Sequence, residues 1–271
     1  MDQFTEERLQ QISRQGYHLD FGAIFNMGFT IWKRVTIPIL GATLLMAIPA
    51  AAIYFLSMPW VYGMDIMELA ELRRNSPNEY IYIINSTEVR LKLLSIISIV
   101  GVLLGPLQAG FYRMCYEADY IGYSDLSSAF VYYKFKYWSR ILVVNFSVFV
   151  LTTLPAFLLG FLGPIVPILN IPYILTLHIF TLLAVPLIIF GDATPLQAIK
   201  YAFRLGAKGF FPLVGFSIIA FLLAFLGALA CCIGIFFSIS YVYVIYYLAY
   251  RQAIGFEENS EDEISPTIEA F

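Results

Sequence analysis

The stretch that decides the fold is residues 192–210, D-A-T-P-L-Q-A-I-K-Y-A-F-R-L-G-A-K-G-F. Its start carries a capping box, because Thr194 suits the N-cap, Pro195 the first helical position and Gln197 the third. At helical spacing, one face carries Leu196, Ile199, Phe203 and Phe210, and the other carries Gln197, Lys200, Tyr201, Arg204 and Lys208. A basic, aromatic amphipathic helix between two membrane-length runs is expected to lie in the plane of the lipid headgroups.

The composition of the whole chain indicates a membrane protein that crosses the bilayer several times. Of its 271 residues, 60% are hydrophobic and only 13% are charged, whereas soluble domains carry about 25% charged residues. Six apolar runs are each long enough to span a bilayer. They cover about 35–57, 92–114, 141–163, 168–190, 211–230 and 233–252. The predicted fold class is therefore an all-α membrane protein with six transmembrane helices arranged as three hairpins.

Each predicted hairpin follows an amphipathic element, and this order suggests a repeated unit. Phe29, Phe135 and Phe203 each precede a basic residue by five positions, and an apolar run follows. We expect each of these elements to be a cytoplasmic interfacial helix that orients its hairpin. The elements are 20–34, 124–140 and 192–210, and the units are 20–114, 124–190 and 192–252.

Three further segments complete the predicted organisation. Residues 1–19 contain a polar surface helix, and residues 58–91 form an outer insert with a short helix near 64–75. The membrane domain as a whole is expected to cover 20–255. Residues 256–271 hold six acidic residues and no basic one, and this tail is predicted to be disordered.

Small residues recur every four positions in two of the runs. Such ridges allow close helix contact, within one chain or between chains. The first ridge is Gly101, Gly105 and Ala109, and the second is Ala220, Ala224, Ala228 and Cys232.

The distribution of basic residues predicts the orientation in the membrane. If the N-terminus is inside, the inner segments hold twelve Lys and Arg residues and the outer segments hold four, namely Arg73, Arg74, Arg90 and Lys92. The positive-inside rule then predicts that both termini lie in the cytoplasm. The first 34 residues are polar or amphipathic, so no cleavable signal peptide is expected.

Charge also indicates the class of partner. Residues 1–255 carry 16 basic residues against 13 acidic ones, a balance that does not suggest nucleic-acid binding. We expect contacts to anionic membrane lipids and to other membrane or cytoplasmic subunits. The candidate residues are Lys33, Arg34, Lys134, Lys136, Arg140, Lys200, Arg204 and Lys208. Asp192 is expected to favour the start of the helix after it through the helix dipole.

Several short motifs resemble a known family. They are Gly105-Pro106, Gly110-Phe111, 126–130, Gly191-Asp192, 198–205, Cys232-Ile233-Gly234 and 247–250. Across about 95–255 the chain resembles bacterial six-helix membrane proteins of unknown function. These are related to the membrane domain that is fused, in some bacteria, to glycerophosphodiester phosphodiesterase. The phosphodiesterase chemistry of those fusions belongs to a separate soluble domain, so the resemblance implies no catalytic residue here.

The sequence offers no recognisable catalytic constellation. The chain has two histidines, His18 and His178, and neither an H-E-x-x-H nor a G-x-S-x-G motif occurs. The three cysteines, at positions 115, 231 and 232, show neither metal nor disulfide spacing. We expect a protein that is not an enzyme, with no cofactor, no metal ligands and no catalytic residues.

One polar group lies near the middle of a predicted span. A histidine at this depth is costly and often functional, which makes His178 and Asn145 a candidate intramembrane site. The structural alternative is a neutral imidazole bonded to Asn145, to Thr152 or to a carbonyl freed by Pro186. No Asp, Glu, Lys or Arg falls inside a predicted span, which argues against an ion-driven transporter.

Two functions remain open at this point. The first is a non-enzymatic scaffold, assembly or lipid-organising subunit whose basic helices meet anionic lipid or a partner protein. The second is a transporter or channel-like protein for a lipid or hydrophobic solute, which requires a polar cavity reaching mid-bilayer near His178.

Overall fold

The structure is a computed structural model that describes residues 1–159, 166–229 and 233–256. These residues are helical, and no strand occurs among them. Five helical segments in this part of the chain are long and apolar enough to cross a membrane. They are Phe21–Tyr62, Thr87–Tyr120, Phe135–Pro155, Asn170–Ile189 and Phe210–Leu229. The predicted sixth span coincides with α11 (Ile233–Ala253), which is not among these five.

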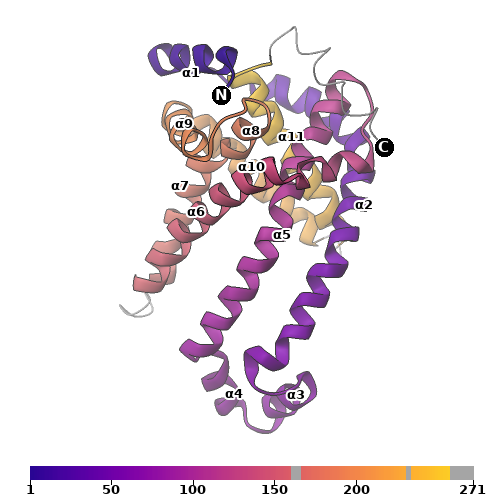
Figure 1. The fold of residues 1–271 in the computed structure, drawn as a ribbon, viewed down its shortest axis with the longest axis vertical. Helices are drawn as coiled ribbons and strands as arrows, with labels where there is room; N and C mark the ends of the chain where they lie inside the picture. Colours follow the sequence, from indigo (N-terminus) through magenta and orange to yellow (C-terminus); the bar gives the residue numbers. More distant parts are fainter. Residues whose placement is uncertain (160–165, 230–232, 257–271) are drawn as a thin grey trace.

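The long helices α2 (Phe21–Tyr62) and α5 (Thr87–Tyr120) connect two groups of helices that lie at opposite ends of the molecule (Figure 1). These two helices run side by side. They lead to α3 (Ile66–Asn75) and α4 (Pro77–Ile84) at one end. Helix α1 (Gln3–Gln15) lies at the other end. The predicted helices over 4–15 and 64–75 are therefore confirmed, whereas α4 was not predicted.

The first predicted interfacial element is wrong as a separate helix. Residues 20–34 continue into the first apolar run, because α2 is one helix of 42 residues. At about 1.5 Å per residue it is roughly 63 Å long, about twice the ~30 Å hydrocarbon core. Its buried stripe continues from Ile24 through Ile31, Val35 and Ile39, so the same face packs on both sides of the expected boundary.

The second predicted amphipathic element is wrong as an α-helix. Residues 126–133 form a 3-10 helix, η1 (Leu126–Tyr133), and α6 (Phe135–Leu159) begins after the extended residue Lys134. The reason lies in the close approach of η1 to α5. A Cβ added at Gly110 would overlap the backbone of Ala129, so η1 packs directly on the helix.

Tyr133 of η1 and Trp138 of α6 donate hydrogen bonds to α5 near Pro106. Pro106 lacks the N–H that would otherwise bond the carbonyl of Val102 four residues earlier. Trp138 Nε1 donates to that carbonyl at 3.3 Å, and Tyr133 Oη donates to the carbonyl of Leu103 at 2.6 Å. Neighbouring helices commonly satisfy backbone groups freed by proline in membrane proteins. The Gly105-Pro106 and Gly110-Phe111 motifs thus mark where η1 and α6 dock on α5.

The fourth apolar run is divided into two helices. Helix α7 (Val166–Thr181) ends before Leu182, and α8 (Ala184–Ile189) follows. A continuous helix would place the ring of Pro186 against the carbonyl of Leu182, which accounts for the break.

The helix that follows α8 begins as the sequence predicts. Helix α9 (Pro195–Lys208) has the capping box between Thr194 and Gln197, with Pro195 at its start. Its C-cap is Gly209, and Phe210 already belongs to α10 (Phe210–Leu229). The predicted apolar face is partly wrong, because Leu196 is 78% exposed and the buried side is Ala198, Ala202, Leu205 and Gly206. This side is buried because α9 packs on α7, α8, α6 and α1.

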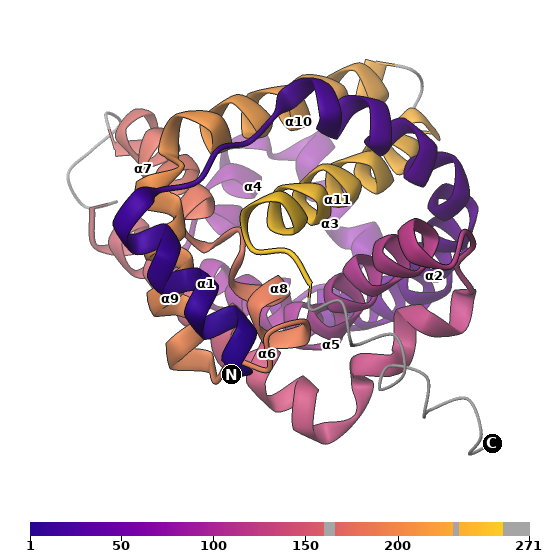
Figure 2. The same cartoon turned by 90° about the horizontal axis from the view of Figure 1, so that it is seen from above.

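Helix α11 forms the centre of the bundle and α1 covers α9 (Figure 2). Helix α11 packs against α10, α2 and α5, and residues 244–250 are buried. Trp32 Nε1 of α2 donates to Ser240 Oγ of α11 at 3.0 Å. Phe25, Gly28 and Trp32, which belong to the first predicted amphipathic element, thus contact α11.

The small-residue ridges are only partly used. Gly105 packs on Asn145 and Ala109 is buried, whereas a side chain at Gly101 would meet no atom within 4 Å. On α10, Ala220 is buried, and a Cβ added at Gly227, which is not a ridge residue, would overlap the backbone of Gly234 in α11. The predicted ridge residue Cys232 and the tail residues 257–271 lie outside the described residues.

Candidate functional site

A stripe of basic residues lies on the exposed side of α9. Lys200, Arg204 and Lys208 are four residues apart and are all exposed, so they follow one side of the helix; we call them the α9 basic stripe. No acidic group in the described part of the chain lies within ion-pair distance of them. Arg204 lies over the ring of Tyr201, 5.4 Å from its centroid.

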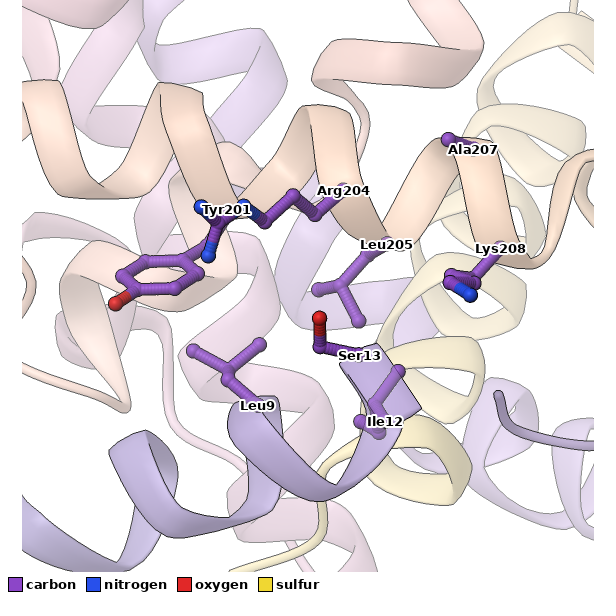
Figure 3. Close-up of a pocket in the computed structure, with 8 residues that line it drawn as sticks. All are labelled: Leu9, Ile12, Ser13, Tyr201, Arg204, Leu205, Ala207 and Lys208. Atoms are coloured by element: carbon purple, nitrogen blue, oxygen red, sulfur yellow. The ribbon is translucent and has the colours of Figure 1, made fainter. Parts of the chain in front are cut away.

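A groove of about 280 Å³ separates this stripe from α1 (Figure 3). Leu9 and Ile12 of α1 and Leu205 of α9 form its buried apolar floor. Arg204 and Lys208 lie towards opposite ends of it. We call this the α1–α9 groove. It combines an apolar floor with an unneutralised positive rim, as a site for an anionic amphiphile requires.

A buried tyrosine fixes the end of α9 next to this groove. Tyr17 Oη donates to the carbonyl of Leu205 at 3.0 Å. Burial raises the pKa of Tyr17 above its usual value. A Cβ added at Gly209, the C-cap, would overlap the Tyr17 ring. The segment between α1 and α2 thereby holds the C-terminus of α9 in place.

Two of the other predicted cations are paired. Arg140 Nη1 lies 2.5 Å from Asp192 Oδ1, and Lys136 Nζ lies 3.9 Å from the same oxygen. Asp192 has a φ of 41° and precedes the N-cap Thr194 by two residues. The expected interaction of Asp192 with the dipole of α9 stays a prediction. The structure adds that its carboxylate joins the start of α6 to the loop before α9.

The remaining predicted cations have separate environments. Lys33 Nζ lies 4.3 Å from the centroid of Phe29, one turn away on α2. Arg34 Nη1 donates to the carbonyl of Ala118 at 2.8 Å, near the C-terminus of α5. Such a contact suits a cation at the negative end of a helix. Lys134 is exposed, and its carbonyl accepts from the backbone of Trp138 at 3.0 Å.

The sequence analysis missed two acidic residues near the C-terminus of α5. Glu117 accepts hydrogen bonds from Arg113 Nε at 2.8 Å and from Ser128 Oγ of η1 at 2.6 Å. The i, i+4 spacing of Arg113 and Glu117 is the signal that predicts this pair. Their location in a mostly buried side-chain network marks them as packing elements that bind η1 to α5.

The second acidic residue joins α5 to α11. Asp119 accepts from Tyr247 Oη at 2.8 Å and lies 2.7 Å from Arg251 Nη1. The side chain of Asp119 is 10% exposed and that of Arg251 is 30% exposed. No short-range pattern links residues 119 and 251, so only the tertiary structure brings them together.

The predicted intramembrane pair does not form one site. His178 Nε2 lies 3.4 Å from Tyr246 Oη of α11, so its partner is not Asn145, Thr152 or a backbone carbonyl. Asn145 instead packs against Gly105 of α5 and lines a separate cavity.

This separate cavity, which we call the α5–α6 groove, has a volume of about 430 Å³. Helices α5 and α6 form its walls, and Tyr243 of α11 also lines it. His178 lines neither this groove nor the α1–α9 groove. The α5–α6 groove is lined by Ile97, Ser98, Gly101, Val102, Leu104, Gly105, Pro106, Gln108, Leu142, Asn145, Phe146, Val148, Phe149, Thr152 and Tyr243.

Within residues 1–159, 166–229 and 233–256, no three His, Cys, Asp or Glu side chains lie close enough to hold a metal ion. Comparisons of the chain with protein-family models, with curated proteins and with solved structures found no match.

Proposed function

We propose that this protein is a non-enzymatic, lipid-organising subunit of a bacterial inner membrane and that its α9 basic stripe contacts anionic lipid. The observation that carries the proposal is that Lys200, Arg204 and Lys208 form no ion pair with any of the described residues and lie beside an apolar groove. Each basic residue near an anionic membrane surface contributes about 1 kcal/mol to binding. Three such residues supply up to about 3 kcal/mol, enough to select anionic from zwitterionic lipid.

The other cations at this end of the molecule support the choice of α9. Arg140 and Lys136 share Asp192, Arg113 is paired with Glu117, and Arg251 is paired with Asp119. An ion pair leaves little net charge for an external phosphate. The basic stripe therefore differs from Lys136 and Arg140 in having charge left for a ligand. Among the predicted cations without an ion pair in the described residues, only Arg204 and Lys208 of the stripe line the α1–α9 groove.

The proposed orientation follows the same charges. Helices α1 and α9 lie at the opposite end of the molecule from α3 and α4 (Figure 1). Arg73 and Arg74 lie on α3, whereas the predicted inner residues include the basic stripe. We place α1, α9 and both termini in the cytoplasm by the positive-inside rule. In this arrangement α11 serves as the sixth span, in agreement with the six-helix family that the motifs resemble.

The transporter alternative has less support. It requires a polar cavity near His178, and neither of the two grooves is lined by that residue. The imidazole of His178 instead contacts Tyr246 on a neighbouring helix, at 3.4 Å. A neighbouring hydroxyl satisfies a buried polar group without any transport role.

The proposal is tested by measuring which lipids stay bound to the protein. We would reconstitute it in nanodiscs of mixed phosphatidylglycerol and phosphatidylcholine, extract them gently and quantify each lipid by mass spectrometry. Changing Lys200, Arg204 and Lys208 together to Gln should reduce the retained phosphatidylglycerol at least tenfold relative to phosphatidylcholine, since about 1.4 kcal/mol equals a factor of ten.

The matched control changes Arg73, Arg74 and Arg90 to Gln, which removes the same charge at the opposite end of the molecule. This control should retain phosphatidylglycerol like the unchanged protein. Equal retention by both triple variants would refute a specific role of the α9 basic stripe.

A further inference from the structure

Two amides line the same part of the α5–α6 groove, which we call its polar end. Asn145 of α6 packs against Gly105, and Gln108 follows Gly105 by one turn on α5. The remaining lining residues are mostly aliphatic and aromatic. Ser98 and Thr152 also line the groove, but their hydroxyls donate to the carbonyls of Leu94 and Val148 in their own helices. Their polarity is therefore satisfied, and this part of the groove presents an apolar surface.

One of the two amides has no partner among the described residues. Gln108 bonds to Tyr112, whereas the half-buried side chain of Asn145 makes no hydrogen bond in the described part of the chain. Both helices are apolar enough to lie in the membrane. An unpaired polar group in hydrocarbon costs several kcal/mol. A ligand that bonds to the amide of Asn145 would remove this cost.

The depth of this polar end is set by two arginines. Gln108 precedes Arg113 by five residues on α5, and Asn145 follows Arg140 by five residues on α6. At 1.5 Å per residue, each amide lies about 7.5 Å along the helix axis from its arginine, Gln108 before Arg113 and Asn145 after Arg140. If the arginines mark the headgroup layer, the amides lie at the level of the glycerol and ester groups of a lipid.

The lack of charged side chains in the lining of the groove indicates which kind of lipid headgroup fits it. No charged side chain lines it. The nearest arginines along the two helices are already neutralised, because Arg113 is paired with Glu117 and Arg140 with Asp192. A phosphate at this position would find no free cation. An uncharged headgroup with hydroxyl and ester oxygens needs none and can bond to Asn145.

We propose that the α5–α6 groove binds a neutral diacyl lipid of the diacylglycerol class, with its glycerol hydroxyl and esters at Asn145 and one acyl chain along the apolar wall. The volume of about 430 Å³ lies within the range of roughly 300–1,000 Å³ that is usual for small-molecule sites. This site is separate from the α9 basic stripe, so either proposal can fail without the other.

Photocrosslinking with two lipids of identical acyl chains tests the proposal. The purified full-length chain would be reconstituted in phosphatidylcholine vesicles with a diacylglycerol that carries a diazirine in one chain, or with the matching phosphatidylglycerol. The diacylglycerol should label α5 and α6 peptides at the groove at least fivefold more than phosphatidylglycerol does. Equal labelling by both probes would overturn the proposal, because it is the result for unselective lipid contact.

Two variants distinguish the site from its surroundings. Gly101→Leu should abolish labelling without loss of folding, because nothing lies within 4 Å of a Cβ at this position. Asn145→Leu should reduce labelling about fivefold by removing one hydrogen bond. Ala228→Leu, an exposed position on α10 outside the groove, is the matched control and should label normally.

Unchanged labelling in Gly101→Leu would overturn the proposal whatever the other variants show. Crosslinks between two protein chains at the same peptides, in place of lipid adducts, would also overturn it. They would identify the groove as an interface between two copies of this chain.

Discussion

Replacing Gly110 with alanine is expected to destabilise the protein, whereas the same change at Gly101 is expected to stabilise it. Both glycines lie in α5, where alanine is favoured over glycine by about 0.5–1 kcal/mol. A Cβ added at Gly110 would overlap the carbonyl carbon and oxygen of Ala129. Because these are backbone atoms, rotation of a side chain cannot relieve the overlap.

The size of the effect follows from these two terms. Overpacking costs typically about 1–3 kcal/mol, and the upper value applies here because η1 must move as a unit. Gly110→Ala should therefore lose about 2 kcal/mol net, and Gly101→Ala should gain up to about 1 kcal/mol. For a chain of about 150–250 residues, 1 kcal/mol shifts Tm by about 2–4 °C, so the two variants should differ by roughly 6–12 °C.

Thermal unfolding in a mild detergent, followed by the fluorescence of the three tryptophans, measures this difference. Gly101→Ala is the control for helix propensity, since it makes the same substitution in the same helix without a contact. A Gly110→Ala protein that is as stable as Gly101→Ala would refute the direct packing of η1 on α5. It would also remove our explanation of the Gly110-Phe111 motif.

Two further predictions concern hydrogen bonds to backbone carbonyls. Tyr133→Phe should lower the free energy of unfolding by about 1 kcal/mol, because the hydrogen bond from its hydroxyl to the carbonyl of Leu103 is lost. Thermal unfolding measures this, and unchanged stability would contradict a stabilising role of Tyr133 next to Pro106. Above pH ~10 stability should fall as pH rises, because the raised pKa of Tyr17 keeps the folded state protonated while the unfolded state ionises. Tyr17→Phe should make this fall smaller between about pH 9 and 11, and an identical pH profile in the variant would contradict it.

Local sequence signals predicted the elements that depend on neighbouring residues. The capping box of Thr194 and Gln197 placed the start of α9, since all of its atoms lie within one turn. The apolar runs located the long helices because spanning length depends on composition alone. The short helix in residues 64–75 was also predicted from local sequence, and the structure shows that Asp65 caps it.

Predictions failed where long-range packing overrides a local pattern. Residues 124–140 have an aromatic and basic composition that suits an interfacial helix, but the contact with Gly110 and the carbonyls near Pro106 holds them as η1 and the start of α6. The sequence predicted a separate interfacial helix over residues 20–34. The helix continues because its buried stripe continues past residue 34.

The candidate sites show the same division. The basic residues were identifiable from the sequence, but which of them form ion pairs with acidic residues was not. Asp192 neutralises Arg140 from 52 positions away, whereas the stripe on α9 has no such partner among the described residues. Asn145 was predicted as a partner of His178, and the structure places it in a different cavity.

The sequence by itself determined that this chain is helical, apolar enough for a membrane, and supplied with a capped basic helix before its last two apolar runs. These properties depend on hydrogen bonds within one turn and on the transfer of side chains out of water, which each segment carries alone. Only the tertiary structure decided which cations are neutralised, where helices break, and that Asn145 faces a groove without a partner. Those features depend on distances between residues far apart in the chain, and the packing of α5, α6, α9 and α11 sets these distances.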